Sequence, residues 1–130
     1  MGLHPHVERM RSVYDAFEAG DAGPLLAQMT ADTVWHFPGD NPMGGTFRGL
    51  DEIRTRIRPV PEDGEPLHFE VHDIASSGRH VVVLFHLTGR RDGKSLDVGA
   101  GHLLHVYGEG NVAEGWTIVE NVSTFDEFWA

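Results

Sequence analysis

Two polar residues, His102 and Thr117, stand in stretches that are otherwise rich in apolar and β-branched residues. Histidine changes its charge near neutral pH, so an imidazole on an apolar wall can transfer a proton or donate a hydrogen bond to a substrate oxygen. A neighbouring threonine hydroxyl can hold that imidazole in place. The alternative is a buried neutral His102 that is satisfied by Thr117 or by the backbone, with Thr117 as an ordinary strand residue.

The turn residues decide which side chains lie beside His102. Asp92-Gly93 is typical of a two-residue hairpin turn, because such a turn needs positive φ angles. It pairs Val83 with His102 and Phe85 with Ala100 on one face of the sheet.

Glu109-Gly110, read as a second two-residue turn, pairs His102 with Thr117 and Val106 with Ala113. A three-residue loop would shift this register by one residue. We therefore expect a concave apolar wall that is interrupted by His102 and Thr117.

Hydrophobic spacing predicts the elements around this wall. The expected elements are helices over residues 7–19, 24–29, 50–58 and 122–129, and strands over residues 33–37 and 67–74 followed by three strands between His80 and Glu120. Segment 40–49 is expected to be a loop over the pocket, and segment 59–66 an acidic linker. Helices followed by mostly antiparallel strands predict an α+β fold, in which a curved sheet with helices on its concave face encloses a pocket.

The composition restricts the function. A chain of 130 residues is expected to form one domain, residues 1–130. The formal net charge of −10 argues against nucleic acid and against anionic membrane surfaces as partners. Cysteine is absent, no apolar run reaches ~18 residues and the N-terminus has no signal-peptide core, so we expect a cytoplasmic protein without disulfides.

No metal site is expected. His68, Glu70 and His72 would share one face of a strand, but alternate residues are ~7 Å apart, too far for one ion without a ligand from another strand. The segment Gly39–Gly49 is rich in glycine but lacks the Gly-Lys-Ser/Thr sequence of a phosphate-binding loop.

Several segments, in this order and spacing, resemble the SnoaL-like branch of the NTF2-like superfamily. They are residues 19–21 (AGD), 31–39 (ADTVWHFPG), 45–49 (GTFRG) leading into 50–53 (LDEI), 91–94 (RDGK), 102–106 (HLLHV) and 126–129 (DEFW). The resemblance spans essentially the whole chain. It implies a cone-shaped α+β barrel, in which a long N-terminal helix and shorter helices cover the concave face of a bent sheet. Members commonly dimerise, and they include ketosteroid isomerases, polyketide cyclases and limonene epoxide hydrolases.

The catalytic carboxylates of these relatives are replaced in this chain. Ketosteroid isomerases have a carboxylate base just before the proline that ends the first strand, where this chain has Phe37. The tyrosine of their first helix falls on Val13, so Tyr14, one residue away, is expected to point elsewhere. Their second carboxyl group falls near His102, and the catalytic Asp of the cyclases and epoxide hydrolases falls on Thr117. We therefore do not expect ketosteroid isomerase activity.

The favoured hypothesis is an enzyme without a cofactor that acts on an apolar, cyclic compound with a carbonyl or an epoxide, as an isomerase, cyclase or hydrolase. His102 would move a proton or polarise the oxygen, with Thr117 in support. The alternatives are a binding or accessory module for an apolar ligand and a filled cone with a structural role. The residues expected to line the pocket are Val13, Phe17, Trp35, His36, Phe37, Phe69, Val83, Phe85, Ala100 and Phe128. Whether Trp35 or His36 faces the pocket depends on the register of the first strand.

The opposite, convex face of the predicted hairpins has an apolar centre and a polar rim. Val82, Leu84, Leu103 and Trp116 meet there in the registers given above. Such a patch is larger than a soluble monomer usually exposes, and its anatomy is typical of a protein interface. We therefore expect a homodimer in which two copies of this face pair, with Trp116 near the centre.

Overall fold

The structure is a computed structural model that describes residues 5–57 and 65–130. Its elements, in chain order, are α1 (Pro5–Glu18), α2 (Gly23–Leu26), β1 (Val34–Phe37), β2 (Gly45–Arg48), α3 (Leu50–Ile53), β3 (His68–Ser76), β4 (His80–Arg91), β5 (Lys94–Tyr107), β6 (Asn111–Val119) and α4 (Val122–Trp129). Most of the predicted acidic linker and the last residue of the predicted third helix lie outside the described residues.

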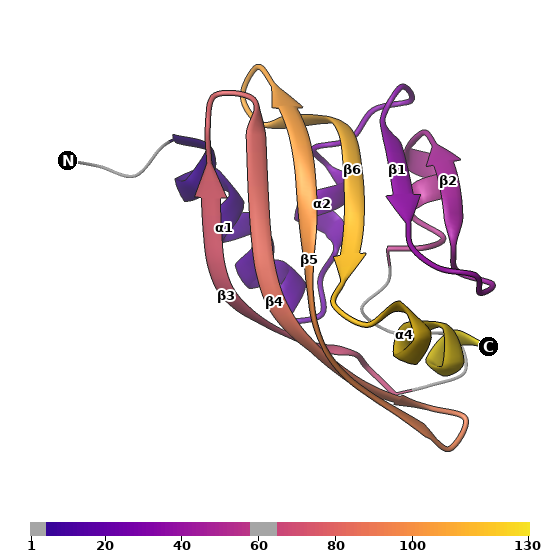
Figure 1. The fold of residues 1–130 in the computed structure, drawn as a ribbon. Coiled ribbons are helices and arrows are strands. Elements are labelled where there is room, and N and C mark those ends of the chain that lie inside the picture. The colour runs from indigo at the N-terminus through magenta and orange to yellow at the C-terminus, as the bar shows by residue number, and fades with distance from the viewer. Residues whose placement is uncertain (1–4, 58–64) are drawn as a thin grey trace.

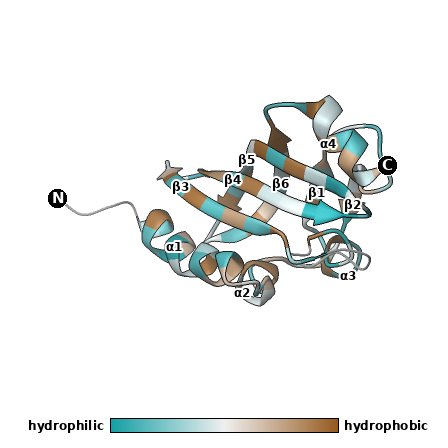
Figure 2. Cartoon of the chain, turned by 90° about the horizontal axis from the view of Figure 1, so that it is seen from below, coloured by the Kyte–Doolittle hydropathy of each residue, from teal (hydrophilic) through white to brown (hydrophobic). Residues whose placement is uncertain are grey.

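The strands form one mixed, curved sheet in the order β2-β1-β6-β5-β4-β3. Strands β1 and β6 run parallel, and every other neighbouring pair is antiparallel. Helices α1 and α2 lie across one face of this sheet, and α4 lies beside the lower ends of β5 and β6 (Figure 1). The view in Figure 2 shows α1, α2 and α3 together on that side of the sheet. The predicted α+β fold with a curved sheet is confirmed.

The β4–β5 hairpin has the register that its turn residues predict. Asp92 and Gly93 both have positive φ angles, 52° and 75°, as a two-residue hairpin turn requires. Every predicted pair is present, from Arg91 opposite Lys94 to His80 opposite His105. Because side chains alternate along a strand, this register decides that His102 points toward the helices.

The β5–β6 turn differs from the prediction, although the pairing near His102 is the predicted one. Tyr107 pairs with Asn111, so the loop has three residues, and Val106 pairs with Val112 instead of Ala113. A bulge after His105 then shifts the register back by one residue. His102 is therefore opposite Thr117 as predicted, because the longer loop and the bulge compensate each other.

The segment between β1 and α3 also differs from the prediction. It was expected to be a loop, but Gly45–Arg48 forms strand β2 and pairs with all of β1. Two glycines, Gly45 and Gly49, have positive φ angles at its two ends. Because such glycines are typical of turns, the sequence pattern there does not predict a strand. Helix α3 is shorter than expected and ends at Ile53.

Helix α4 has the predicted bounds and closes one end of the concave face. Asn121 caps it by accepting a hydrogen bond from the Thr124 backbone N–H. Its carboxyl end is attached to the β4–β5 hairpin, because Arg91 donates to the Phe128 carbonyl and Lys94 to the Ala130 carbonyl. Among the described residues, no helix has the length and apolar character needed to cross a lipid bilayer.

Candidate functional site

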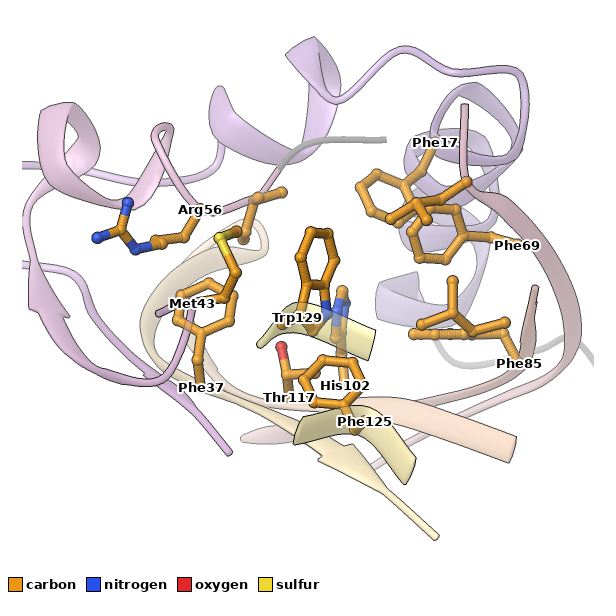
Figure 3. A pocket seen from close by; sticks show the side chains of 13 residues that line it. Phe17, Phe37, Met43, Arg56, Phe69, Phe85, His102, Thr117, Phe125 and Trp129 are labelled. Atoms are coloured by element: carbon orange, nitrogen blue, oxygen red, sulfur yellow. The ribbon is translucent and has the colours of Figure 1, made fainter. Parts of the chain in front are cut away.

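A small aromatic pocket lies between the concave face of the sheet and the elements that cover it (Figure 3). Its volume is about 60 Å³. Its lining consists of Phe17, Phe37, Met43, Arg56, Ile57, Leu67, Phe69, Phe85, Leu87, His102, Thr117, Phe125 and Trp129. Within this set, nitrogen or oxygen atoms of side chains come from Arg56, His102, Thr117 and Trp129 alone.

His102 lies on the floor of the pocket and is held by Tyr14 of α1. The hydroxyl of Tyr14 is 2.7 Å from Nδ1 of His102, in a buried hydrogen bond. The imidazole is 4% exposed. Its ring lies edge-on to Trp35, with 4.9 Å between centroids, and to Phe85, at 5.1 Å. Aromatic rings on two sides and a hydrogen bond on a third therefore fix its orientation.

Burial sets the protonation of this pair. It raises the pKa of the Tyr14 phenol and lowers the pKa of His102 to about 3, so both groups are neutral at neutral pH. Within the described chain, the one hydrogen-bond partner of Tyr14 is His102, so its O–H donates to Nδ1. The imidazole proton then resides on Nε2, which has no hydrogen-bond partner among the described residues. We conclude that His102 presents an N–H donor to the pocket.

Thr117 lies beside His102 but is bound to a different residue. Its Oγ1 accepts a hydrogen bond of 2.9 Å from Nε1 of Trp35. Trp35 packs flat over Gly115, where an added Cβ would lie 2.4 Å from the Trp35 ring. Because the oxygen of Thr117 is occupied as an acceptor, its own proton is available to donate into the pocket. Among the described residues the hydrogen bond to Nδ1 of His102 comes from Tyr14, and Thr117 is bonded to Trp35.

The pocket includes some of the predicted lining residues and not others. His102, Thr117, Phe17, Phe37, Phe69 and Phe85 line it, whereas Val13, Trp35, His36, Val83, Ala100 and Phe128 do not. Val13, Trp35, Val83 and Phe128 are buried in the surrounding core.

His36 lies on the convex face of the sheet. The first strand therefore has the register in which Trp35, and not His36, points toward the concave side. Nε2 of His36 is 2.6 Å from Glu114, and its ring stacks on Trp116. Trp35 therefore points inward and contacts His102 from the side.

The sequence did not predict Tyr14 as part of the site, nor the lining residues Met43, Arg56, Ile57, Leu67, Leu87, Phe125 and Trp129. Tyr14 was expected to point away from the site, but the rotation of α1 on the sheet brings its hydroxyl to His102. The available signal was a tyrosine at helical spacing from Phe17, both on the apolar side of α1. Met43, Arg56 and Trp129 come from the loop after β1, the turn after α3 and the end of α4, which local patterns do not place relative to the sheet.

Metal ligation has no support in the described residues. No three His, Cys, Asp or Glu side chains there lie close enough together to hold one ion. His72 and Glu70 are 3.9 Å apart on the exposed side of β3. The two form a pair and not a metal-binding cluster.

The chain is similar to proteins with a SnoaL-like domain, both in sequence and in structure. Residues 10–115 match the family model of the SnoaL-like domain. An uncharacterised protein of Mycobacterium tuberculosis is 25% identical over 127 residues, which cover 95% of each chain. The structure of Bal32a, from a soil-derived mobile gene cassette, superposes with a TM-score of 0.85 at 27% identity and 97% coverage of both chains. A putative SnoaL-like polyketide cyclase from Jannaschia has a TM-score of 0.74 at 20% identity, with 97% of this chain and 92% of that one covered.

Proposed function

Since the chain belongs to the SnoaL-like domain family, we propose that it binds an apolar organic compound through a carbonyl-type oxygen and polarises that oxygen, so that the compound isomerises or cyclises. Two donors on the pocket floor would contact the oxygen, Nε2–H of His102 and the hydroxyl of Thr117. The observation that carries the proposal is the hydrogen bond from Tyr14 to Nδ1 of His102, which directs the imidazole N–H toward the pocket.

The chemistry that fits these donors is electrophilic. Hydrogen bonds aimed at an oxygen that gains negative charge stabilise an enolate or a related transition state, most of all where water is excluded. The described lining holds no Asp or Glu, and Nδ1 of His102 is occupied by Tyr14. Solvent or the substrate itself would therefore act as the base.

The pocket must open for a ligand of drug-like size. A cavity that holds benzene has a volume of about 150 Å³, and this pocket has about 60 Å³. Met43, from the loop after β1, and Trp129, from the end of α4, are lining residues from segments outside the sheet. We expect their displacement to enlarge the pocket enough to admit a ring.

Acetophenone is a suitable test compound, because it combines one ring with one carbonyl. On binding, its infrared carbonyl stretch should shift to lower frequency, and exchange of its methyl protons with D2O should accelerate. Both effects should disappear in His102→Phe and persist in His68→Phe, which changes an exposed histidine on β3. Binding without any carbonyl shift in the wild-type protein would contradict the proposal.

A second candidate function is ligand binding without chemistry, and the lack of a carboxylate in the described lining favours it. In that case acetophenone would bind, its carbonyl would shift, and proton exchange would stay at the rate in free solution. The exchange measurement therefore separates the two functions.

A further inference from the structure

The indole N–H of Trp129 is a buried hydrogen-bond donor without an acceptor among residues 5–57 and 65–130. Trp129 is 7% exposed and lines the pocket, and among the described residues nothing accepts a hydrogen bond from its Nε1. Such groups are rare in folded proteins, because they lose their hydration without a replacement partner. Figure 3 shows the indole of Trp129 in the middle of the pocket, with its nitrogen on the side of His102. A ligand atom in the pocket can supply the missing acceptor.

The side chains that line this pocket offer more hydrogen-bond donors than the oxygen of one ketone can accept. Nε2–H of His102, the hydroxyl of Thr117 and Nε1–H of Trp129 make three donors around a volume of about 60 Å³. A carbonyl oxygen has two lone pairs, whereas a carboxylate offers about four acceptor positions. Three donors in the lining of one small pocket therefore match an anionic oxygen group better than a neutral ketone.

Charge also favours an anion. The chain has 20 acidic and 10 basic residues, Lys and Arg, yet the described lining contains one charged residue, Arg56, and no acidic one. Its guanidinium lies over the Phe47 ring, 4.7 Å from the centroid, and makes no ion pair with Asp or Glu in the described part of the chain. Its Nε is buried and has no acceptor there. In Figure 3, Arg56 lies at the side of the pocket near Met43 and Phe37.

We propose that this pocket selects apolar acids, that is, ring compounds with a carboxylate or an acidic enol, and that Trp129 is the residue that recognises the anionic oxygen. The oxygens would accept from Trp129, His102 and Thr117, and the positive charge of Arg56 would offset part of the cost of removing the anion from water. This proposal rests on the proposed function, since it assumes that the pocket binds a ligand oxygen. It narrows the ligand class from oxygen-bearing compounds to acids.

The test compares four ligands that share one ring and differ in one group: benzoate, acetophenone, toluene and benzylamine. Affinities are measured at neutral pH by titration calorimetry. In parallel, nuclear magnetic resonance follows the indole N–H signals of the three tryptophans, with the Trp129 signal assigned by its loss in Trp129→Phe. The wild-type spectra test the proposal even if that variant folds poorly.

We expect benzoate to bind about tenfold more tightly than acetophenone, because a hydrogen bond to a charged group is stronger than one to a neutral group. Benzoate should move the Trp129 indole proton downfield, and toluene and benzylamine should leave it in place. Trp129→Phe should abolish the preference for benzoate over acetophenone, because it removes the donor that recognises the anionic oxygen. The control Trp116→Phe, on the convex face, should retain the preference.

Equal affinity for benzoate and acetophenone, or an unmoved Trp129 signal at benzoate saturation, would overturn the proposal. The proposed function would survive that result, because acetophenone would still bind through His102. If His102→Phe bound acetophenone as the wild type does, the proposed function itself would fail. The two outcomes are therefore distinguishable.

Discussion

Tyr14 determines what the imidazole of His102 can do. Its hydroxyl donates to Nδ1 across 2.7 Å, so the ring proton is held on Nε2. Without this contact the proton could occupy either nitrogen, and Nδ1 would be a buried acceptor without a partner. The residue that sets the chemistry of the site is thus one that does not itself line the pocket.

Tyr14→Phe should lower the free energy of unfolding by about 1–3 kcal/mol, since it leaves a buried nitrogen unsatisfied. It should also produce a mixture of imidazole tautomers at His102. Urea unfolding measures the first effect, and the ¹⁵N shifts of the ring measure the second. Tyr107→Phe is the matched control, because Tyr107 is 48% exposed. A single Nε2–H tautomer that persists in Tyr14→Phe would contradict the role given to Tyr14.

His102 should also make the stability depend on pH. Burial lowers its pKa from 6.5 to about 3 in the folded protein. Between these pH values the unfolded chain binds a proton at this residue and the folded chain does not. The contribution of His102 to the free energy of unfolding is therefore fully present above pH 6.5 and falls as the pH decreases toward 3, by up to ~1.4 kcal/mol per pH unit.

His102→Gln should remove this part of the pH dependence, whatever its effect on stability at pH 7. Urea unfolding at several pH values between 7 and 4 gives the slope for each protein. His68→Gln, which changes an exposed histidine, should keep the wild-type slope. Equal slopes for His102→Gln and the wild type would mean that His102 is protonated inside the fold.

At the scale of elements, the loop after β1 and helix α4 form one connected cover. Oδ1 of Asp126 on α4 accepts hydrogen bonds from the Asp40 backbone N–H at 3.0 Å and from the Asn41 amide at 2.7 Å. Oδ1 of Asn41 in turn accepts from the Met43 backbone N–H at 2.8 Å. The side chain of Met43 lines the pocket. The position of Met43 therefore depends on a carboxylate of α4.

Asp126→Ala should loosen this cover and speed ligand entry. The Asp40 amide should exchange with D2O faster, since its acceptor is gone, and benzoate should associate faster in stopped-flow fluorescence. Glu127→Ala is the control, because it changes an exposed carboxylate on the neighbouring residue of α4. Unchanged exchange and association in Asp126→Ala would show that the cover is held by other contacts.

The sequence predicted the register of the long strands better than it predicted how the loop after β1 and helix α4 cover the pocket. Asp92-Gly93 permits one hairpin geometry, so the β4–β5 register followed from two residues. The pairing of His102 with Thr117 was predicted from a two-residue turn, and it holds because the bulge after His105 compensates for the longer loop. Strand β2 was missed, since its glycine-rich surroundings are typical of turns.

The polar residues of the candidate site were predicted only where they belong to the sheet. His102 and Thr117 were found because strand alternation decides their face. Tyr14 and Trp129 were not, because the rotation of α1 and the path of α4 depend on packing over the whole molecule and not on local spacing. The sequence motifs therefore predict the polar residues on the floor of the pocket, whereas Tyr14 and Trp129 are placed only by the three-dimensional structure.

At the scale of the whole molecule, the convex face of the sheet exposes large apolar side chains to solvent. Leu84 and Ile118 are each 44% exposed there, next to half-buried Val82, Leu103 and Trp116. The rings of His36 and His105 pack on Trp116, with centroid distances of 5.2 and 4.7 Å. The result is an apolar centre with a rim of histidines and acidic residues, among them the pairs His36–Glu114 and His86–Asp97.

A second copy of this chain is the partner that we expect on that face. A sheet face that pairs with itself across a two-fold axis brings its apolar centre against an identical centre and places the polar rims at the edge. An added Cβ at Gly101 would lie 3.2 Å from Leu84 and 3.5 Å from Ile118, so these two side chains cover the glycine and belong to one apolar centre.

We expect the wild type to sediment as a dimer and Trp116→Glu as a monomer in sedimentation velocity, because a buried carboxylate at the centre would face its own copy across the axis. Leu84→Glu, which changes an exposed residue and disturbs the fold less, should weaken the dimer in the same direction. Val122→Glu is the control, since Val122 is similarly exposed, 43%, but lies at the start of α4 and outside this face. Circular dichroism establishes that each variant is folded. A wild type that sediments as a monomer, or two face variants that sediment as the wild type does, would contradict a dimer through the convex face.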